Sequence, residues 1–291
     1  MKKFEVIYPK WDDPRWKLLA IQLSFIVYTV LSPGFTRTWT QFAATLAGTL
    51  LTEIAFLLYK KLPIVPVSGI LPAAAIMILV DSETNWIYFV VGVISLASKH
   101  LIRNRQRHIF VPNNFGIVFG ILFLQSYMTT TVGRWGGDWA PLVVITMLGL
   151  YMSHQAGRLA LSLAYIATFL AALPVRHALN HVPLLTLFAP FTGAAFQQFT
   201  FFVMTDPIVT PRPVRWQVLF GIAVGVVDAF IRHNQIKYAP FFALMVVCAV
   251  YSFLEDIFGW EWTRPWSLGK AVVTQESLPA PVRALIPAGS E

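Results

Sequence analysis

The chain has 291 residues, of which 56% are hydrophobic and only 12% are charged, and its formal net charge is +8. A soluble domain carries about 25% charged residues, so this composition excludes a soluble globular protein, a disordered chain and a coiled coil. The single cysteine, Cys248, excludes a disulfide scaffold. We therefore expect an all-α, polytopic integral membrane protein.

Ten apolar segments follow one another along the chain, and each is a candidate for a membrane-spanning helix, which needs about 20 residues. Several begin at Trp or Tyr, as residues at the headgroup level do. The third and fifth are short and flanked by Pro and Gly, which is typical of broken or re-entrant helices. The segments are residues 16–31, 39–59, 67–80, 86–97, 114–127, 139–152, 158–173, 182–204, 216–231 and 238–257.

These segments divide into two five-helix halves, at about residues 16–127 and 139–257, within a single transmembrane domain of residues 1–261. Beyond it, residues 262–291 are polar and rich in proline. Such a composition cannot form a packed core, so we expect an extended or partner-bound cytoplasmic tail.

The distribution of basic residues predicts the orientation, because cytoplasmic loops carry an excess of Lys and Arg. If the N-terminus is cytoplasmic, 17 of the 22 Lys and Arg lie on the cytoplasmic side. We therefore expect a multi-pass protein of the bacterial inner membrane with both termini in the cytoplasm. The basic residues left on the outer side are Arg37, Arg134, Arg176, Arg232 and Lys237.

Two proline-centred polar turns interrupt the apolar background, one in each half. The first is SKHLIRNRQRHIFVPNNFG, residues 98–116, and the second is FFVMTDPIVTP, residues 201–211. Both fall on the predicted cytoplasmic side. Paired breaks at corresponding positions of two halves mark the binding site in transporter-like folds, so we expect these turns to form the functional site.

Both turns resemble signatures of one family, the B subunit of the sodium-pumping NADH:quinone reductase and the D subunit of the Rnf electron-transport complex. The first family pattern is GK followed at fixed spacing by FNPAxxG, and the second is similar to FFMATDPVTSP followed by a glycine-containing helix. The matching residues are Lys99, Phe110, Pro112 and Gly116 for the first, and Phe201, Phe202, Thr205, Asp206, Pro207, Thr210, Pro211, Gly221, Gly225 and Arg232 for the second.

The resemblance implies a membrane subunit that holds a flavin or a quinone, but the chain departs from the family pattern. Arg103, Arg105 and Arg107 replace a glycine-rich loop, and Val111 replaces an Asn. The family attaches FMN to Thr in a motif like SGAT, whereas residues 125–138 contain no such motif. We therefore expect no covalent FMN, and any flavin (FMN or riboflavin) or quinone to be noncovalent. In this the chain is similar to the short UnbU-like branch of the family.

The basic residues of the first turn have two interpretations. They follow the topology rule and contact anionic lipids, or they form a clamp for a flavin phosphate or an acidic partner, since Arg matches phosphate oxygens. The second turn also has two interpretations. Its polar residues have only the structural role of ending one helix and forming the turn, or its hydroxyls face a cofactor. The candidate cofactor-binding residues are Lys99, Arg103, Arg107, His108, Asn113, Asn114, Thr205, Asp206 and Thr210.

Two carboxylates lie within predicted helices, where ionisable groups suggest ion or proton paths. Asp228 is four residues from Arg232, so an ion pair explains it better. Glu53 has no partner visible in the sequence and is the better proton or cation candidate. His177 and His181 fall in an outer loop or helix end, so we expect no haem, and no metal site is predicted.

Three functions stay open. The leading one is a subunit of an electron-transport assembly, ion-coupled and at most a redox subunit without independent catalysis. The second is a cofactor-free UnbU-like transporter or channel, and the third is a membrane scaffold subunit of a larger complex. The expected partners are other membrane-complex subunits and anionic lipids, and no nucleic acid.

The predicted topology is testable by reporter fusions. A reporter active only in the periplasm should give no signal when fused after Glu291, and a strong signal when inserted within residues 81–85. A periplasmic signal after Glu291 would mean that one crossing has been missed or added.

Overall fold

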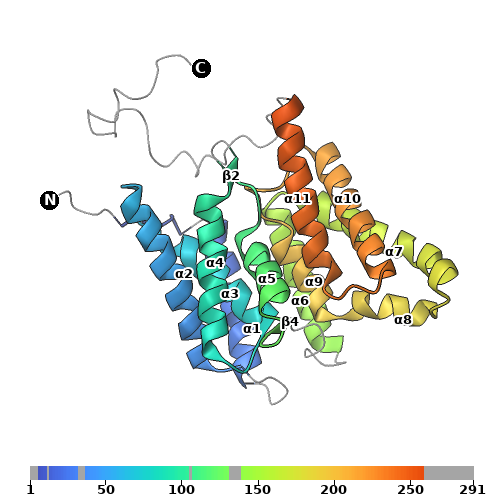
Figure 1. The fold of residues 1–291 in the computed structure, drawn as a ribbon, viewed down its shortest axis with the longest axis horizontal. Coiled ribbons are helices and arrows are strands. Elements are labelled where there is room, and N and C mark those ends of the chain that lie inside the picture. The colour runs from blue at the N-terminus through green and yellow to red at the C-terminus, as the bar shows by residue number, and fades with distance from the viewer. Residues whose placement is uncertain (1–5, 12, 32–36, 105–106, 131–138, 259–291) are drawn as a thin grey trace.

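The computed structural model describes residues 6–11, 13–31, 37–104, 107–130 and 139–258. Helices make up most of this part of the chain (Figure 1), which confirms the predicted helical class. The predicted tail, residues 262–291, lies outside the described residues, and so does Arg105.

The helices and short strands follow the predicted apolar segments closely. In the first half they are α1 (Pro14–Leu31), α2 (Trp39–Tyr59), α3 (Val67–Leu79), β1 (Val80–Asp81), α4 (Asn85–Leu101), β2 (Arg103–Asn104), β3 (Arg107–His108), α5 (Pro112–Phe123) and β4 (Thr129–Thr130). In the second half they are α6 (Trp139–Gln155), α7 (Leu159–Asn180), α8 (Leu184–Phe188), η1 (Ala189–Thr192), α9 (Ala194–Gln198), η2 (Phe199–Val203), α10 (Val214–His233) and α11 (Ala239–Phe258).

Four of the described helices are long and apolar enough to cross a membrane: α2, α7, α10 and α11. Apolar side chains also cover the outside of the molecule. Leu51 on α2, Met147 on α6, Phe230 on α10 and Phe253 on α11 are each more than 60% exposed. A surface of this kind is stable against lipid tails and costly in water, so the helices have the length and the surface of a membrane protein.

The predicted eighth segment, residues 182–204, is not the single continuous helix that we expected. It is divided into α8, the 3₁₀-helix η1, α9 and the π-helix η2. Pro190 lies inside η1, and Gly193 has an extended backbone with φ −87° and ψ 136°. Proline and an extended residue both interrupt the i to i−4 hydrogen bonds of an α-helix, which explains the division.

The two halves repeat one order of packing. In the first half α2 packs on α4, α1 on α3, and α4 on α5; in the second half α7 packs on α10, α6 on α9 and η2, and α10 on α11. Glycines allow close contact between helices in each half. A Cβ at Gly92 of α4 would stand 3.1 Å from the Thr45 carbonyl oxygen of α2, and one at Gly225 of α10 would stand 2.6 Å from the Thr168 Cβ of α7. Small residues permit such close approach of helices in membranes.

The connections between helices gather at two opposite ends of the molecule, which we call the β2 end and the β4 end. At the β2 end, Lys17 Nζ at the start of α1 lies 3.4 Å from the hydroxyl of Tyr151 near the end of α6. Figure 1 shows that α2, α4 and α11 also finish at this end. At the β4 end, β1 pairs antiparallel with β4, and Arg37 Nη1 lies 3.1 Å from Asp81 Oδ1.

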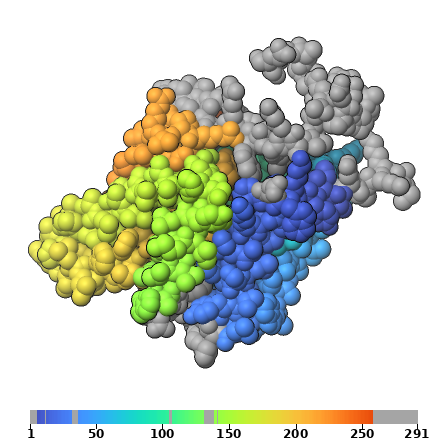
Figure 2. Space-filling model, turned by 180° about the vertical axis from the view of Figure 1, so that it is seen from behind, coloured from blue at the N-terminus to red at the C-terminus, as the bar shows by residue number. Residues whose placement is uncertain are grey.

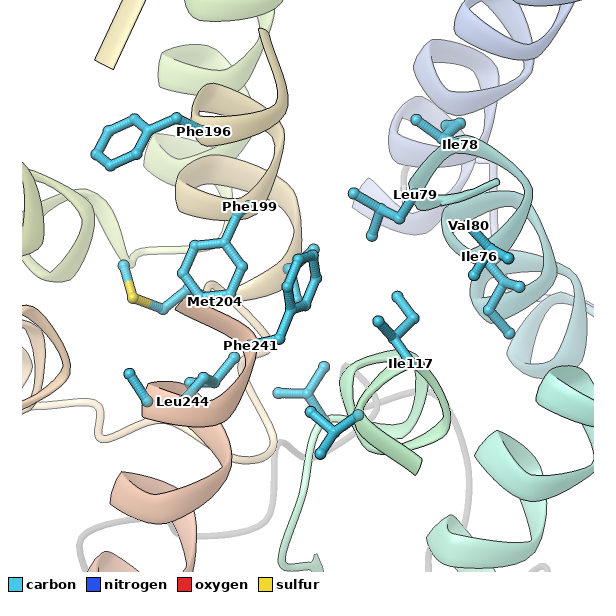
Figure 3. Close-up of a cluster of buried hydrophobic side chains, with 14 of the residues drawn as sticks. Ile76, Ile78, Leu79, Val80, Ile117, Phe196, Phe199, Met204, Phe241 and Leu244 are labelled. Atoms are coloured by element: carbon cyan, nitrogen blue, oxygen red, sulfur yellow. The ribbon is translucent and has the colours of Figure 1, made fainter. Parts of the chain in front are cut away.

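The core lies between the two halves. Ile76, Ile78 and Leu79 of α3 and Ile117 of α5 face side chains of α9, η2 and α11, as Figure 3 shows. The halves also meet where α1 packs on α6, which is visible from behind as the seam between the blue and green atoms in Figure 2. This arrangement brings the two predicted polar turns to the same end of the molecule.

Candidate functional site

The two polar turns, which lie about one hundred residues apart in the sequence, meet at the β2 end. The first contains the hairpin of β2 and β3, and the second connects η2 to α10. His108 Nε2 lies 3.5 Å from Asp206 Oδ2, and Arg107 Nη1 donates to the carbonyl oxygen of Val209 at 3.4 Å. The structure thus brings together three of the predicted site residues, at what we call the turn junction.

The second turn is closed by its own polar groups. Asp206 Oδ1 accepts the backbone N–H of Ile208 at 2.9 Å, and the Asp206 carbonyl oxygen accepts the Thr210 hydroxyl at 2.6 Å. The Thr205 hydroxyl donates to the carbonyl oxygen of Phe201 at 2.7 Å. An aspartate whose side chain accepts a backbone N–H two residues later forms a turn by itself. Thr205 and Thr210 therefore have structural partners within the turn.

Arg158 fixes the turn from the next helix, a role that we did not predict. It is the residue before α7, its Nε donates to the Thr210 hydroxyl at 2.8 Å, and its Nη2 donates to the carbonyl oxygens of Pro207 at 3.1 Å and Thr210 at 3.3 Å. Burial and the nearby charge of Arg212 lower the pKa of Arg158 to about 10, so the guanidinium stays charged at neutral pH. In the sequence Arg158 was only one of the basic residues on the predicted inner side.

Arg107 is held by α11 as well as by the second turn. It forms an ion pair with Glu255, which is 5% exposed, and its guanidinium lies 5.3 Å from the ring centroid of Tyr251. Beside it, Asn104 Nδ2 donates to Ser252 Oγ at 2.9 Å. Glu255 was not among the predicted site residues, because nothing in the sequence places the end of α11 beside the first turn.

Asn113 and Asn114 lie at the start of α5, and Asn114 joins this helix to α11. The Asn113 side chain accepts the Asn114 backbone N–H at 2.9 Å, and Asn114 Nδ2 donates to the carbonyl oxygen of Phe241 at 3.0 Å. Asn114 is 1% exposed. The Asn114 side chain therefore holds the two halves together, whereas the Asn113 hydrogen bond is local to the start of α5.

Glu53 of α2 lies in a second cluster, which is formed with side chains of α3 and α4. Its Oε1 accepts from Lys99 Nζ at 2.8 Å and from the Ser68 hydroxyl, and its Oε2 lies 2.7 Å from His100 Nε2. Glu53 is 2% exposed, and the His100 ring stacks on Phe56 with centroids 4.8 Å apart. Lys99 therefore faces Glu53. We call Glu53, Ser68, Lys99 and His100 the Glu53 cluster.

Arg103, the remaining basic candidate of the first turn, has an exposed side chain at the β2 end. Its Nη1 donates to the carbonyl oxygen of Lys99 at 3.4 Å. Its exposure fits the interpretation that places basic side chains against anionic headgroups.

Asp228 lies at the opposite end of the second half, and its predicted ion pair with Arg232 is confirmed. Arg232 Nε lies 2.9 Å from both carboxylate oxygens, and the Tyr165 hydroxyl of α7 donates to Asp228 Oδ2 at 3.2 Å. Asp228 is fully buried, and the Arg232 guanidinium lies 5.4 Å from the ring centroid of Phe169. Tyr165 completes this group and was not predicted.

Several of the residues proposed to bind a flavin phosphate are paired within the chain. Three basic side chains proposed for a phosphate each face a carboxylate of the same chain: Lys99 faces Glu53, Arg107 faces Glu255, and His108 faces Asp206. A phosphate would have to displace those carboxylates.

No protein-family model matches the chain, and no curated protein matches it. The resemblance to the reductase and Rnf subunits therefore stays a prediction that rests on the residues of the two turns.

The turn junction predicts an acid-sensitive stability. Burial alone would raise the pKa of Asp206, but the hydrogen bond and charge of His108, the Ile208 N–H and the charge of Lys99 outweigh it, so the pKa lies below its ordinary value of 3.8. A carboxylate with a lowered pKa stabilises the folded state above its ordinary pKa, and this contribution is lost as the pH falls through the folded pKa.

We expect Asp206→Asn to lower the free energy of unfolding by about 1–2 kcal/mol at pH 6 to 7, because a hydrogen-bonded charge is lost. The melting temperature of the detergent-solubilised protein measures this, and the difference from wild type should shrink below about pH 4. Asp256→Asn is the matched control, because Asp256 is exposed at the same end. The amide oxygen of the substituted side chain could still accept the hydrogen bond from Asn104. Equal shifts for both variants, or a difference unchanged down to pH 3, would contradict the role of Asp206.

Proposed function

We propose that this chain is a cofactor-free membrane transport protein in which a buried carboxylate couples the movement of a proton to that of a monovalent cation. The observation that carries the proposal is the Glu53 cluster. Glu53 is buried in α2, one of the helices long enough to cross a membrane, and side chains of α3 and α4 hold it. An ionisable residue inside a membrane helix is costly and marks ion or proton paths in transport proteins.

The proposal includes about ten crossings of a bacterial inner membrane with both termini cytoplasmic. It is supported by the 17 basic residues on one side and by the helix ends that gather at the β2 and β4 ends. The shorter helices α3 and α5 pack against neighbouring helices, which is where incomplete crossings are tolerated. The β2 end would then face the cytoplasm and its anionic lipids.

The chemistry of the Glu53 cluster suits exchange between an internal and an external cation. The Lys99 ammonium already occupies the position that a monovalent cation would take beside Glu53 and the Ser68 oxygens, at 2.8 Å from Glu53 Oε1 and 2.9 Å from Ser68 Oγ. Protonation of Glu53, or its binding of another cation, would release Lys99. Because Ser68 begins α3 and Lys99 ends α4, this release would loosen the contact between three helices.

The test is transport in liposomes that contain the purified protein and a trapped pH-sensitive dye. A gradient of Na⁺ or K⁺ should change the internal pH in wild-type liposomes, and Glu53→Gln should slow this change at least about tenfold, since the variant removes the charge at the coupling site. Glu83→Gln is the matched control, because Glu83 is exposed and the chemical change is the same.

Melting temperatures separate loss of coupling from loss of folding. Lys99→Met gives a second variant of the same pair, and we expect it to abolish coupling as well. Unchanged transport in Glu53→Gln, or no cation-dependent pH change in the wild type with either cation, would contradict the proposal.

A second candidate is a membrane subunit of an electron-transport assembly, bound to other membrane-complex subunits or acting as their scaffold. A specific observation favours it: the two turns that resemble that family meet in space, with His108 beside Asp206. In this case any flavin or quinone would bind at a site completed by a partner subunit, because Lys99, Arg107 and His108 already face carboxylates of this chain.

An absorption spectrum distinguishes the two candidates. We expect the purified protein to be colourless, and a flavin band near about 450 nm that co-purifies with the chain would favour the electron-transport candidate. Denaturing electrophoresis under ultraviolet light should show no fluorescent band at the mass of the chain. A fluorescent band lost on substitution of Thr130 would instead identify a covalent flavin.

A further inference from the structure

His100 contacts a different oxygen of Glu53 from Lys99, and the proposed transport assigns it no role. Its Nε2 lies 2.7 Å from Glu53 Oε2, whereas Lys99 Nζ and the Ser68 hydroxyl both contact Oε1. The carboxylate thus has a cation and a hydroxyl on one oxygen and an imidazole on the other. Because Lys99 already supplies the opposite charge that a buried carboxylate needs, His100 is not required to neutralise Glu53.

The His100 ring is held in one plane near the end of α4. It stacks on Phe56 of α2, with an angle of 11° between the ring planes. His100 lies in the last turn of α4, and its carbonyl oxygen accepts from Lys60 Nζ at 3.1 Å, at the end of α2. Among the described residues, the ionisable side chains that contact His100 or its carboxylate partner are Glu53 and Lys60 from α2 and Lys99 from α4. The ring therefore lies between Glu53 and the β2 end.

The second ring nitrogen of His100, Nδ1, reaches water. It makes no hydrogen bond to the described residues, and it is not one of the unpaired polar atoms that are closed to solvent in this part of the chain. The side chain is 5% exposed, so the opening is small. A histidine with one nitrogen on a buried carboxylate and the other at water has the two contacts that a proton shuttle needs.

We propose that His100 carries protons between water at the β2 end and Glu53, an inference that deepens the proposed transport and rests on it. A proton from water binds Nδ1 of the neutral ring. The Nε2–H bond then breaks and an O–H bond forms on Glu53 Oε2, across 2.7 Å. The ring returns to its first state when Nδ1 loses its proton to water and Nε2 takes one up.

This transfer gives a reason for the release of Lys99. Before it, the ionised Glu53 balances the charge of Lys99 and the ring is neutral. After it, Glu53 is neutral, and an ammonium without an opposite charge is costly between helices, so Lys99 leaves the Ser68 oxygens. The proton and the Lys99 ammonium therefore compete for one carboxylate, which links proton entry to the contact between α2, α3 and α4.

Removal and chemical restoration of the ring test the proposal. We expect His100→Ala to slow the uptake of labelled Na⁺ or K⁺ into liposomes at least about tenfold, because the proton path is interrupted. Imidazole at equal concentration on both sides of the bilayer should restore the uptake. Pyrazole has the same ring shape but takes up no proton near neutral pH, so it should not. A tracer replaces the trapped dye here, because imidazole crosses bilayers and would disturb the internal pH.

His154→Ala is the matched control, because His154 is exposed in the last turn of α6. This variant should take up the cation at the wild-type rate with or without either azole. Restoration of folded His100→Ala by both azoles would mean that the ring only fills space, and would overturn the proposal. Restoration by neither azole, or a wild-type rate in His100→Ala alone, would overturn it as well.

His100→Gln keeps the test decisive if His100→Ala fails to fold. Its amide N–H can still donate to Glu53, but the amide carries no proton to it. We expect a melting temperature near that of the wild type and uptake slowed at least about tenfold. Equal uptake by the wild type and His100→Gln would overturn the role of His100 alone. Failure of the proposed transport is distinguishable, because the wild type itself would then show no cation-dependent pH change.

Discussion

The cost of burying charge between helices is the constraint on which this structure depends. A carboxylate or a cation removed from water is stable only when an opposite charge and hydrogen bonds meet it. Glu53 of α2 meets Lys99 of α4, and Arg107 of β3 meets Glu255 of α11. Because each pair joins segments that are distant in the sequence, the same contacts that neutralise charge also fix how the helices pack.

The two halves meet this constraint in parallel ways at opposite ends. Each half has one closest helix pair, α2 with α4 and α7 with α10, and a buried carboxylate lies at each contact. Glu53 lies on α2 and Asp228 on α10, and the basic partner follows a glycine by seven residues in both: Lys99 after Gly92, and Arg232 after Gly225. The glycine allows close approach of the helices. The charge pair then joins α2 to α4 in the first half, whereas in the second half it lies within α10 and the Tyr165 hydroxyl of α7 reaches Asp228.

The turn junction distinguishes two interpretations of the basic residues in the first turn, which are anion binding and pairing within the protein. As a cluster in sequence they suit an anion, because Arg and Lys are the side chains that bind phosphate. In three dimensions Arg107 and His108 have carboxylate partners, so both side chains are engaged within the protein. The residues that carry the family resemblance therefore have a structural role in joining the two halves, which does not depend on any cofactor.

The sequence by itself determined the helical class, most helix bounds and the local contacts. The helix at 39–59 follows from its apolar run and the pair of Asp228 and Arg232 from i, i+4 geometry, which both depend on neighbouring residues alone. Only the tertiary structure decided that Lys99 pairs with Glu53, 46 residues away, and that Arg158 holds Thr210, 52 residues away. The physical reason is that a partner so distant is selected by the path of the chain and the packing of whole helices, which no local pattern encodes.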